Sequence, residues 1–466
     1  MAKEIKRDES FRDSIATIDQ DGNRKYVFPK KPSGKLHNYR LIVSWVLLAV
    51  FFITPFIKVN DEPLFLFDIV NRRFILFGQL FWPQDSYLFA ILMLTVMVFI
   101  VVFTVSLGRL WCGWACPQTV FMEMLFRKVE YFIDGDANKQ RRLVKQGWNF
   151  EKIWKRLIKF SIFALLALLI SNTLFAWVLG TDRLFEIMQE PISENRAAFI
   201  GMMVLSGFLM FVYSWFREQV CVMMCPYGRL QSVLLDSNTI VVAYDYIRGE
   251  PKGNYKKGEN RKEAEKGDCI DCKACVDVCP TAIDIRNGTQ LECVNCTACI
   301  DACNKTMDRV GQPWGLIRFD SEKGISLGQK LKLNARLIAY IAVLLALFTF
   351  LNVLLFSRSD VEATILRTPG LLFQQQDDGK ISNLYNIKVV NKRREQFPIE
   401  IKLMSHQGKI VMAAGDMIVQ PAASTEGVFF VYLDNSDVNG KIPIELGVYS
   451  NDELIDEIHL TFGGPN

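Results

Sequence analysis

The feature that most constrains this chain is a cysteine spacing that occurs twice between residues 269 and 303. Each copy has three cysteines with two residues between neighbours, and a fourth cysteine after three further residues. This spacing is typical of a run that holds two [4Fe–4S] clusters, in which the fourth cysteine of each copy binds the other cluster. One predicted ligand set is therefore Cys269, Cys272, Cys275 and Cys303, and the other is Cys293, Cys296, Cys299 and Cys279.

Zinc is the alternative for these eight thiols, but zinc is usually held by two well-separated C-x2-C pairs rather than by two clustered sets of four. Pro280 follows the first copy and supports a turn, whereas Asn304 stands where a second proline is usual. That departure puts the local turn in doubt and leaves the ligands unchanged. Apolar residues near the cysteines can shield bound clusters from water: Ile270, Val276, Ile283, Ile285 and Val294.

The other four of the 12 cysteines form two C-x3-C-P pairs, Cys112 with Cys116 and Cys221 with Cys225. The following proline suits the first turn of a helix, so Cys116 and Cys225 are predicted at helix N-termini, where the dipole favours the thiolate. Two thiolates at this spacing can hold a soft metal ion, and copper(I) fits best. Redox-active thiols, inert thiols and a structural disulfide are the alternatives, and a reducing cytosol disfavours the disulfide.

Each pair follows an apolar run and precedes an expected amphipathic helix, at 118–132 and 227–235. The chain therefore contains an internal repeat of a span, a C-x3-C-P pair and a helix. Nearby arginines add positive charge that favours the thiolate: Arg109, Arg217 and Arg229.

Five uncharged apolar runs approach the length of about 20 residues that a helix needs to cross a bilayer. They cover residues 41–57, 87–107, 158–179, 197–216 and 337–356. A sixth run at 64–82 contains Asp68, Arg72 and Arg73, and each charge at the centre of a membrane helix costs about 2.5–3.5 kcal/mol. We therefore expect the sixth run to be interfacial or re-entrant, and we predict an α-helical polytopic membrane protein with five transmembrane helices.

The distribution of positive charge predicts the orientation. Segments 1–38, 108–156 and 217–335 hold 9, 10 and 17 Lys and Arg residues, whereas the alternate segments 58–86 and 180–196 hold 3 and 2. Positive loops face the cytoplasm, so we expect the N-terminus and the cluster-binding insert on the cytoplasmic side of the membrane, which the family resemblance given below implies to be a bacterial inner membrane. The C-terminal segment is then periplasmic. The polar, charged N-terminal stretch is not expected to be a signal peptide.

The composition changes after the last apolar run. Short alternating segments are separated by turn signals such as Asp378-Gly379 and Asn439-Gly440, and about seven strands in about 100 residues indicate an immunoglobulin-like sandwich. The predicted organisation is multi-domain: a polar N-terminal segment 1–38, a membrane domain 39–248, an insert 249–335 with a bacterial two-cluster ferredoxin-like core at about 260–312, a fifth span 336–357 and an all-β immunoglobulin-like domain 358–466.

Composition excludes two functional classes. The net charge is only +4 and no basic face with interleaved aromatic residues occurs, so nucleic acid is not an expected partner. The three histidines, His37, His406 and His459, all lie outside the apolar runs. A bis-histidine haem within the membrane therefore cannot form from this chain alone.

The whole pattern resembles the family of the cytochrome c oxidase accessory protein CcoG, also called FixG or RdxA. The matching motifs are W-C-G-W-A-C-P at 111–117, C-V-M-M-C-P-Y-G-R-L-Q at 221–231 and the two cluster runs, and the resemblance covers nearly the whole chain. It implies reduction of Cu(II) to Cu(I) for the assembly of a cbb3-type cytochrome oxidase, with Cys112, Cys116, Cys221 and Cys225 as copper-handling residues. A copper chaperone or oxidase subunits are the implied partners, the cytoplasmic electron donor is unidentified, and a homodimer is left open.

Three functional hypotheses follow. The first is an oxidoreductase that acts as a cupric reductase, because four extra soft ligands accompany a one-electron relay. The second is a quinol-linked polyferredoxin that relays electrons to a partner reductase, although such subunits usually lack an immunoglobulin-like domain. The third is a redox-sensing assembly scaffold. No nucleophile or paired general base accompanies the cluster cysteines, so no catalytic residue is predicted.

Overall fold

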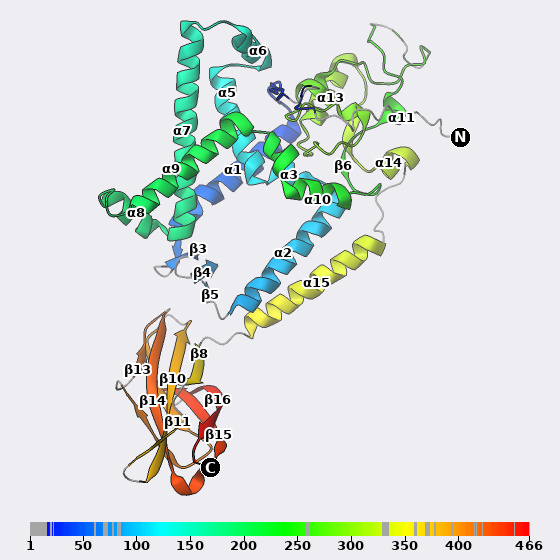
Figure 1. The fold of residues 1–466 in the computed structure, drawn as a ribbon. Coiled ribbons are helices and arrows are strands. Elements are labelled where there is room, and N and C mark those ends of the chain that lie inside the picture. The colour runs from blue at the N-terminus through cyan, green and yellow to red at the C-terminus, as the bar shows by residue number, and fades with distance from the viewer. Residues whose placement is uncertain are drawn as a thin grey trace. The chain divides into compact units, whose positions relative to one another are not determined.

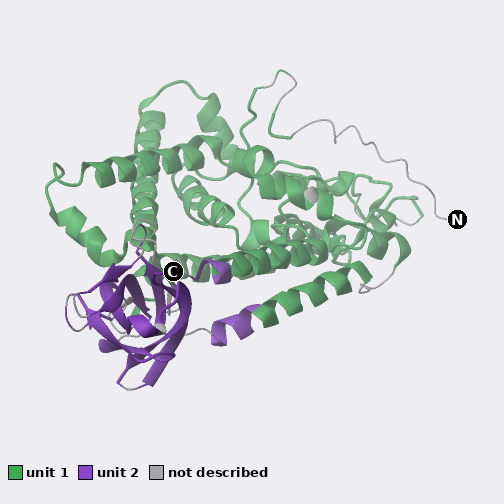
Figure 2. Ribbon diagram, turned by 60° about the horizontal axis from the view of Figure 1, so that its bottom comes forward, with its two compact units in different colours: residues 1–78, 89–350 green, residues 79–88, 351–466 purple. Residues whose placement is uncertain are grey.

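The computed structural model describes residues 16–18, 21, 23–59, 62–68, 73–76, 79–81, 85–256, 259, 261, 263–328, 335–357, 361–368, 373–376, 379–392, 395–413, 415, 417–421, 423–451 and 453–465. The chain divides into two compact units (Figure 2). One unit comprises Met1–Gly78 and Phe89–Phe350, and the other comprises Gln79–Leu88 and Leu351–Asn466.

Among the described residues, five helices are long and apolar enough to cross a membrane, in agreement with the five predicted spans (Figure 1). They are α1 (Lys35–Ile53) with η2 (Thr54–Phe56), α2 (Ser86–Leu107), α7 (Phe150–Leu179), α9 (Arg196–Phe211) with η5 (Val212–Phe216), and α15 (Ala335–Phe356). α7 packs against α9. Much of the apolar surface of these helices is exposed, and α15 has no buried residue, as expected for helices that contact lipid.

The apolar segment 64–82 contains no helix among its described residues, in agreement with the prediction that it is not a sixth span. Its strands are β3 (Phe65–Asp68), β4 (Arg73–Leu76) and β5 (Gln79–Phe81). The rings of Phe65 and Phe67 pack on Trp177, near the C-terminal end of α7, with centroids 5.9 and 6.2 Å from it. Aromatic residues at a span end are typical of the membrane–water interface. Arg72 lies outside the described residues.

The two C-x3-C-P pairs lie in matching places, as the repeat predicts. The short helices after α2 are α3 (Leu110–Trp114), α4 (Pro117–Phe121), η4 (Met122–Phe126), α5 (Arg127–Ile133) and α6 (Ala137–Lys145), and those after η5 are η6 (Val220–Met224) and α10 (Pro226–Leu234). Cys116 and Cys225 are the N-cap residues of α4 and α10, and Pro117 and Pro226 occupy the first turn. Proline is favoured there because its missing N–H has no partner within the helix.

Two antiparallel strands, β6 and β7, flank the cysteine-rich segment, with Val241 opposite Asp320. Its elements are β6 (Val241–Tyr244), α11 (Tyr246–Gly249), α12 (Ala274–Asp277), η7 (Ile285–Asn287), α13 (Ala298–Val310), β7 (Ile317–Asp320) and α14 (Glu322–Leu327). α13 runs through Asn304, whose Oδ1 accepts a hydrogen bond from the Gly315 amide at 3.2 Å. A continuous helix therefore takes the place of the turn that a second proline would have made.

The C-terminal unit contains a two-sheet sandwich. Its strands are β8 (Val361–Arg367), β9 (Gln374–Gln375), β10 (Lys380–Asn391), β11 (Phe397–Leu403), β12 (Gly408–Met412), β13 (Met417–Val419), β14 (Ser424–Asp434), β15 (Lys441–Ser450) and β16 (Glu453–Gly463). One sheet has the order β12-β14-β10-β8, with β9 also on β10, and the other has the order β13-β11-β15-β16. Its core contains no cysteine and is held by apolar packing, with Tyr385 stacked on Phe429 at 5.7 Å.

We expect Phe429→Ala to destabilise the sandwich by about 3–5 kcal/mol, because the side chain is fully buried between the sheets. Phe430→Ala is the matched control, since the next residue of a strand faces the other way and Phe430 is partly exposed. Pulse proteolysis of the full chain in urea, following the C-terminal fragment, measures the difference. Equal losses from the two variants would show that the core is wrongly assigned.

Candidate metal centres

The two cysteine runs adopt the same unusual backbone. Asp271 and Lys273 in the first run, and Asn295 and Thr297 in the second, have positive φ angles of 53°, 55°, 52° and 64°. Left-handed backbone costs a residue with a side chain about 1–2 kcal/mol, so its presence at matching positions indicates a constraint on the loop. Left-handed residues within a loop can turn neighbouring N–H groups to one side and form a concavity that suits iron–sulfur sulfur atoms.

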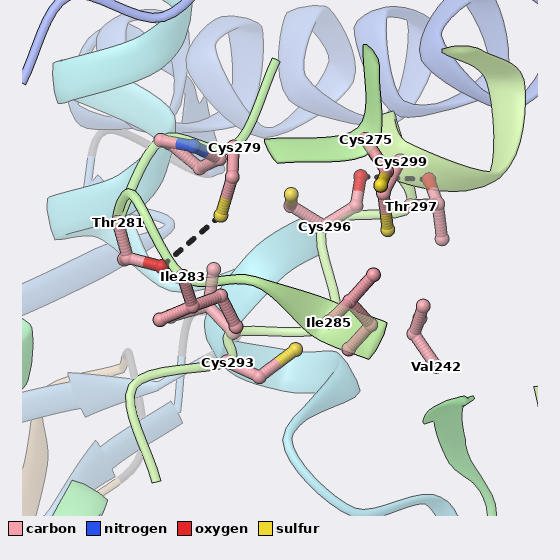
Figure 3. A pocket seen from close by; sticks show the side chains of 12 residues that line it. Val242, Cys275, Cys279, Thr281, Ile283, Ile285, Cys293, Cys296, Thr297 and Cys299 are labelled. Atoms are coloured by element: carbon pink, nitrogen blue, oxygen red, sulfur yellow. Dashed lines mark hydrogen bonds between the residues drawn. The ribbon is translucent and has the colours of Figure 1, made fainter. Parts of the chain in front are cut away.

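One apolar cavity is lined by five of the cysteines (Figure 3). Cys293, Cys296 and Cys299 come from the second run, and Cys279 and Cys275 come from the first run. The Thr281 hydroxyl lies 3.4 Å from the Cys279 sulfur. The other walls of this cavity are mainly apolar and include Val242, Ile283, Ile285 and Val294.

A second apolar cavity holds the other set. Cys269, Cys272 and Cys275 from the first run line it with Cys303 from α13. Each cavity therefore joins three thiols of one run to a cysteine of the other, Cys279 in the first cavity and Cys303 in the second, and Cys275 borders both cavities. Four soft thiol donors within apolar walls fit a [4Fe–4S] cluster, and the individual ligand assignment stays a prediction.

Burial dominates the acid–base state of these thiols. It raises the pKa of Cys275, Cys293 and Cys303 to about 12 and that of Cys279 to about 11. The thiols are thus protonated at neutral pH until a metal centre displaces the protons. Cys272 differs from the other three in its set because it is exposed.

The four C-x3-C-P thiols form one group, here called the thiol quartet (Cys112, Cys116, Cys221 and Cys225). Burial raises the pKa of Cys221 to about 12, and the charges of the other three cysteines add to this rise, so the four lie within electrostatic range of one another. Among the described residues, no three of these sulfurs fall within 4.8 Å of one another. Three thiolates around one ion at about 2.3 Å need shorter separations than that, so no three of these sulfurs are placed to bind one ion together.

The helix N-terminus favours the Cys116 thiolate, as predicted, but burial has the larger effect on the pKa of this thiol. Burial raises the pKa of Cys116, whereas the backbone N–H groups of Gln118 and Thr119 lower it. The net pKa lies above the usual value, so the expectation of a free thiolate is wrong. The sequence could not reveal how deeply the thiol is buried.

Polar side chains surround the quartet. Gln231 is fully buried and accepts hydrogen bonds from Arg109 Nε at 3.0 Å and from the Cys112 thiol at 3.3 Å. Arg217 is also buried, but both of its terminal nitrogens donate to Glu130 at 2.9 Å, so its charge is paired. Arg229 is exposed. Of the three predicted arginines, Arg109 therefore has the most direct link to a thiol.

The quartet shares a wall with the cavity that contains Cys296. Cys112 packs in one apolar cluster with Val294 and Cys296. A Cβ on Gly113 would clash with the Val294 carbonyl oxygen and would lie 3.0 Å from the Cys296 amide nitrogen. Trp114 Nε1 donates to the Asn295 carbonyl at 3.3 Å. The backbones of α3 and of the second cysteine run are therefore in direct contact.

Two residues of this contact were not singled out from the sequence. Gly113 stands between two cysteines and beside tryptophan, and a glycine in such a crowded motif is a signal of close backbone approach. Gln231 gave no signal, because only the folded α10 brings its amide to Cys112.

Sequence-family models match most of the chain. The 4Fe-4S dicluster domain matches residues 216–322, a 4Fe-4S binding domain matches residues 89–136, and the IG-like fold at the C-terminus of FixG matches residues 351–465. The second of these matches includes Cys112 and Cys116. The matches support iron–sulfur binding and an immunoglobulin-like C-terminal domain.

Three curated proteins are similar over most of their length. Protein RdxB of Cereibacter sphaeroides is 37% identical over 400 residues, which cover 82% of each chain. Protein RdxA of the same organism is 35% identical over 437 residues, which cover 88% of this chain and 89% of the relative. Nitrogen fixation protein FixG of Rhizobium meliloti is 30% identical over 444 residues, which cover 87% of this chain and 84% of the relative.

We expect Gly113→Ala to loosen the second cysteine run, because the added methyl group has no room against the Val294 carbonyl. Overpacking of this kind costs about 1–3 kcal/mol, so amide exchange in residues 293–299 should accelerate about tenfold in hydrogen–deuterium exchange of the full chain. Gly207→Ala is the matched control, since a Cβ there meets nothing within 4 Å. Unchanged exchange in the Gly113 variant would contradict the contact.

Proposed function

The chain belongs to the family of FixG, RdxA and RdxB, and we propose that it reduces Cu(II) to Cu(I) for the assembly of a cbb3-type cytochrome c oxidase. Its five apolar helices and its 4Fe-4S domains make it an iron–sulfur electron-transfer protein of the membrane. The reduction of copper is the part of this function that we propose, and the thiol quartet is its proposed site.

We assign one [4Fe–4S] cluster to Cys269, Cys272, Cys275 and Cys303, and the second to Cys293, Cys296, Cys299 and Cys279. The lining of the two cavities supports this division. Bound clusters supply one-electron transfer. Ile283 and Ile285 are buried and keep water from the second cluster, and the exposed Cys272 gives an electron donor access to the first.

The observation that carries the proposal is the wall that Cys112 shares with Val294 and Cys296. Electron tunnelling weakens steeply with distance, so direct packing of a thiol on a cluster loop favours transfer between them. At the quartet each Cu(II) ion accepts one electron and becomes Cu(I). A pair of soft thiolates favours the reduced ion, and the thiols release their protons as the metal binds.

The orientation completes the proposal. The N-terminus, the insert 249–335 and the quartet lie on the cytoplasmic side of a bacterial inner membrane, and the immunoglobulin-like domain 358–466 lies in the periplasm. The excess of Lys and Arg in the segments on the proposed cytoplasmic side supports this arrangement. Cu(I) then passes to a chaperone or to an oxidase subunit.

We expect Cys303→Ser to remove one cluster, although Cys303 lies in the second run. Anaerobically purified protein should lose about four of about eight iron atoms per chain, and the remaining EPR signal should be that of a single cluster. Asn304→Ser is the control and should keep all of the iron. Loss of both clusters or of neither would contradict the crossed ligand sets, and about twelve iron atoms in the unmodified protein would mean that the quartet holds a further cluster.

We expect Cys221→Ser to slow copper reduction at least about tenfold while leaving both clusters in place, because one thiolate of the quartet is lost. Dithionite-reduced protein, freed of excess reductant, is mixed with Cu(II), and a Cu(I)-specific chelator reports the product. Ala115→Ser serves as control, since it adds a hydroxyl in the first C-x3-C-P turn and keeps all four thiols. The proposal fails if the Cys221 variant and the unmodified protein reduce copper at the same rate.

A further inference from the structure

A cavity of about 350 Å³ lies beside α5, α7 and η5, apart from the cluster cavities. Its volume falls within the range of roughly 300–1,000 Å³ that is typical of small-molecule sites. α7 and the α9–η5 helix are two of the membrane-spanning candidates, and the cavity adjoins the N-terminal half of α7 and the C-terminal end of η5. Both ends are on the proposed cytoplasmic side, so the cavity lies at the depth of that leaflet or its interface.

Four buried charged side chains line the cavity, two acidic and two basic: Glu130, Asp134, Lys159 and Arg217. The half-buried Arg156 adds a further positive charge to the lining. Arg217 donates to both oxygens of Glu130, and Lys159 donates to Asp134 Oδ2 at 2.6 Å. Burial raises the pKa of Glu130, but Arg217, Lys159 and Arg127 outweigh it and hold the pKa below its ordinary value.

One acceptor in the wall is unsatisfied. Asp134 is 6% exposed, and its Oδ1 has no hydrogen-bond partner in the part of the chain that the structure describes. A buried carboxylate oxygen without a partner carries a desolvation cost of about 1–3 kcal/mol. A ligand that brings an O–H or N–H donor removes this cost, whereas a ligand with acceptors alone does not.

Aromatic side chains also line the cavity. Phe160 and Phe163 from α7 and Trp215 from η5 line it, and the two phenylalanine rings meet edge to face at 6.4 Å. Aromatic walls favour a flat ring as their occupant. A lipid-soluble flat ring that carries hydroxyl donors is the chemistry of a quinol. The oxidised quinone has the same ring but only acceptors.

We propose that this cavity binds the headgroup of a lipid-borne quinol, with a hydroxyl donating to Asp134 and the ring against Phe163 and Trp215. Arg217 lines this cavity and also the small cavity that contains Cys221, Pro280 and Val294. The bound quinol is thus one side chain away from the thiol quartet and from the second cysteine run.

The role of this site rests on the proposed function and names a donor for it, in addition to any donor at Cys272. Oxidation of one quinol to the quinone releases two electrons and two protons. Each cluster accepts one electron, and each proton passes by way of the Asp134 carboxylate to bulk water. Two Cu(II) ions can then be reduced for each quinol oxidised.

The test measures binding of decylubiquinol to the anaerobic full-length protein in nanodiscs by calorimetry. Asp134→Asn replaces the acceptor without changing the volume, and Ser214→Phe fills the cavity from η5 without removing a charge. We expect each to weaken quinol binding about tenfold or more, Asp134→Asn because the acceptor loses its charge and Ser214→Phe because the added ring occupies the space of the ligand. Val204→Phe is the control, because Val204 is exposed on α9. Cluster absorbance shows that each variant is folded.

A ligand control and a reaction control separate the outcomes. The dimethyl ether of decylubiquinol keeps the ring and cannot donate, so we expect it to bind about tenfold more weakly than the quinol. Dithionite-driven copper reduction should be unchanged in both variants. Undiminished quinol binding in both variants, or equal binding of the ether, would overturn the quinol site and leave the copper proposal standing.

Discussion

The contact between the Gly113 backbone and the loop around Val294 and Cys296 is the interaction on which the arrangement of the metal centres depends. Only a residue without a side chain lets α3 approach this closely. The approach brings Cys112 into the same apolar cluster as Cys296. Arg40 supports the contact from α1, donating to the Gly113 carbonyl at 2.7 Å. A membrane helix, a C-x3-C-P pair and the second cysteine run thus share one packed region.

Burial of the thiols affects both the metal binding and the stability of this region. Apolar walls shield the thiols and raise their pKa values, so the sulfur atoms are protonated before metal binds. A metal centre must displace those protons, which makes metal binding part of the folding free energy of this region. The neighbouring ionic network of Arg127, Glu130 and Arg217 is also buried, and such networks stabilise only when nearly every charge is paired.

The sequence predicted the features that follow from spacing and periodicity. Runs of uncharged apolar residues predicted the five spans, and the alternating segments from Tyr385 to Phe462 predicted the long strands of the sandwich. The prolines after Cys116 and Cys225 predicted helix starts. The short strands β9 and β13 were not expected from the sequence, because two or three residues are too few to show an alternation of apolar and polar side chains.

Features that depend on tertiary contacts could not be predicted from the sequence. Three such features arise from packing between distant segments. They are the left-handed backbone at Lys273 and Thr297, the hydrogen bond between Gln231 and Cys112, and the burial of the Cys116 thiol. The pairing of Cys279 with the second run and of Cys303 with the first was predicted only because the spacing is so specific. Only the folded structure shows that Oδ1 of Asp134 has no hydrogen-bond partner among the described residues.

The most direct test of electron transfer from the clusters to copper is rapid-freeze EPR of the dithionite-reduced protein mixed with Cu(II). Both the reduced clusters and Cu(II) are paramagnetic, so one spectrum follows donor and acceptor together. We predict that the two signals decline at the same rate and that one cluster is reoxidised for each Cu(II) lost. A Cu(II) signal that persists while the clusters stay reduced would contradict the reductase function.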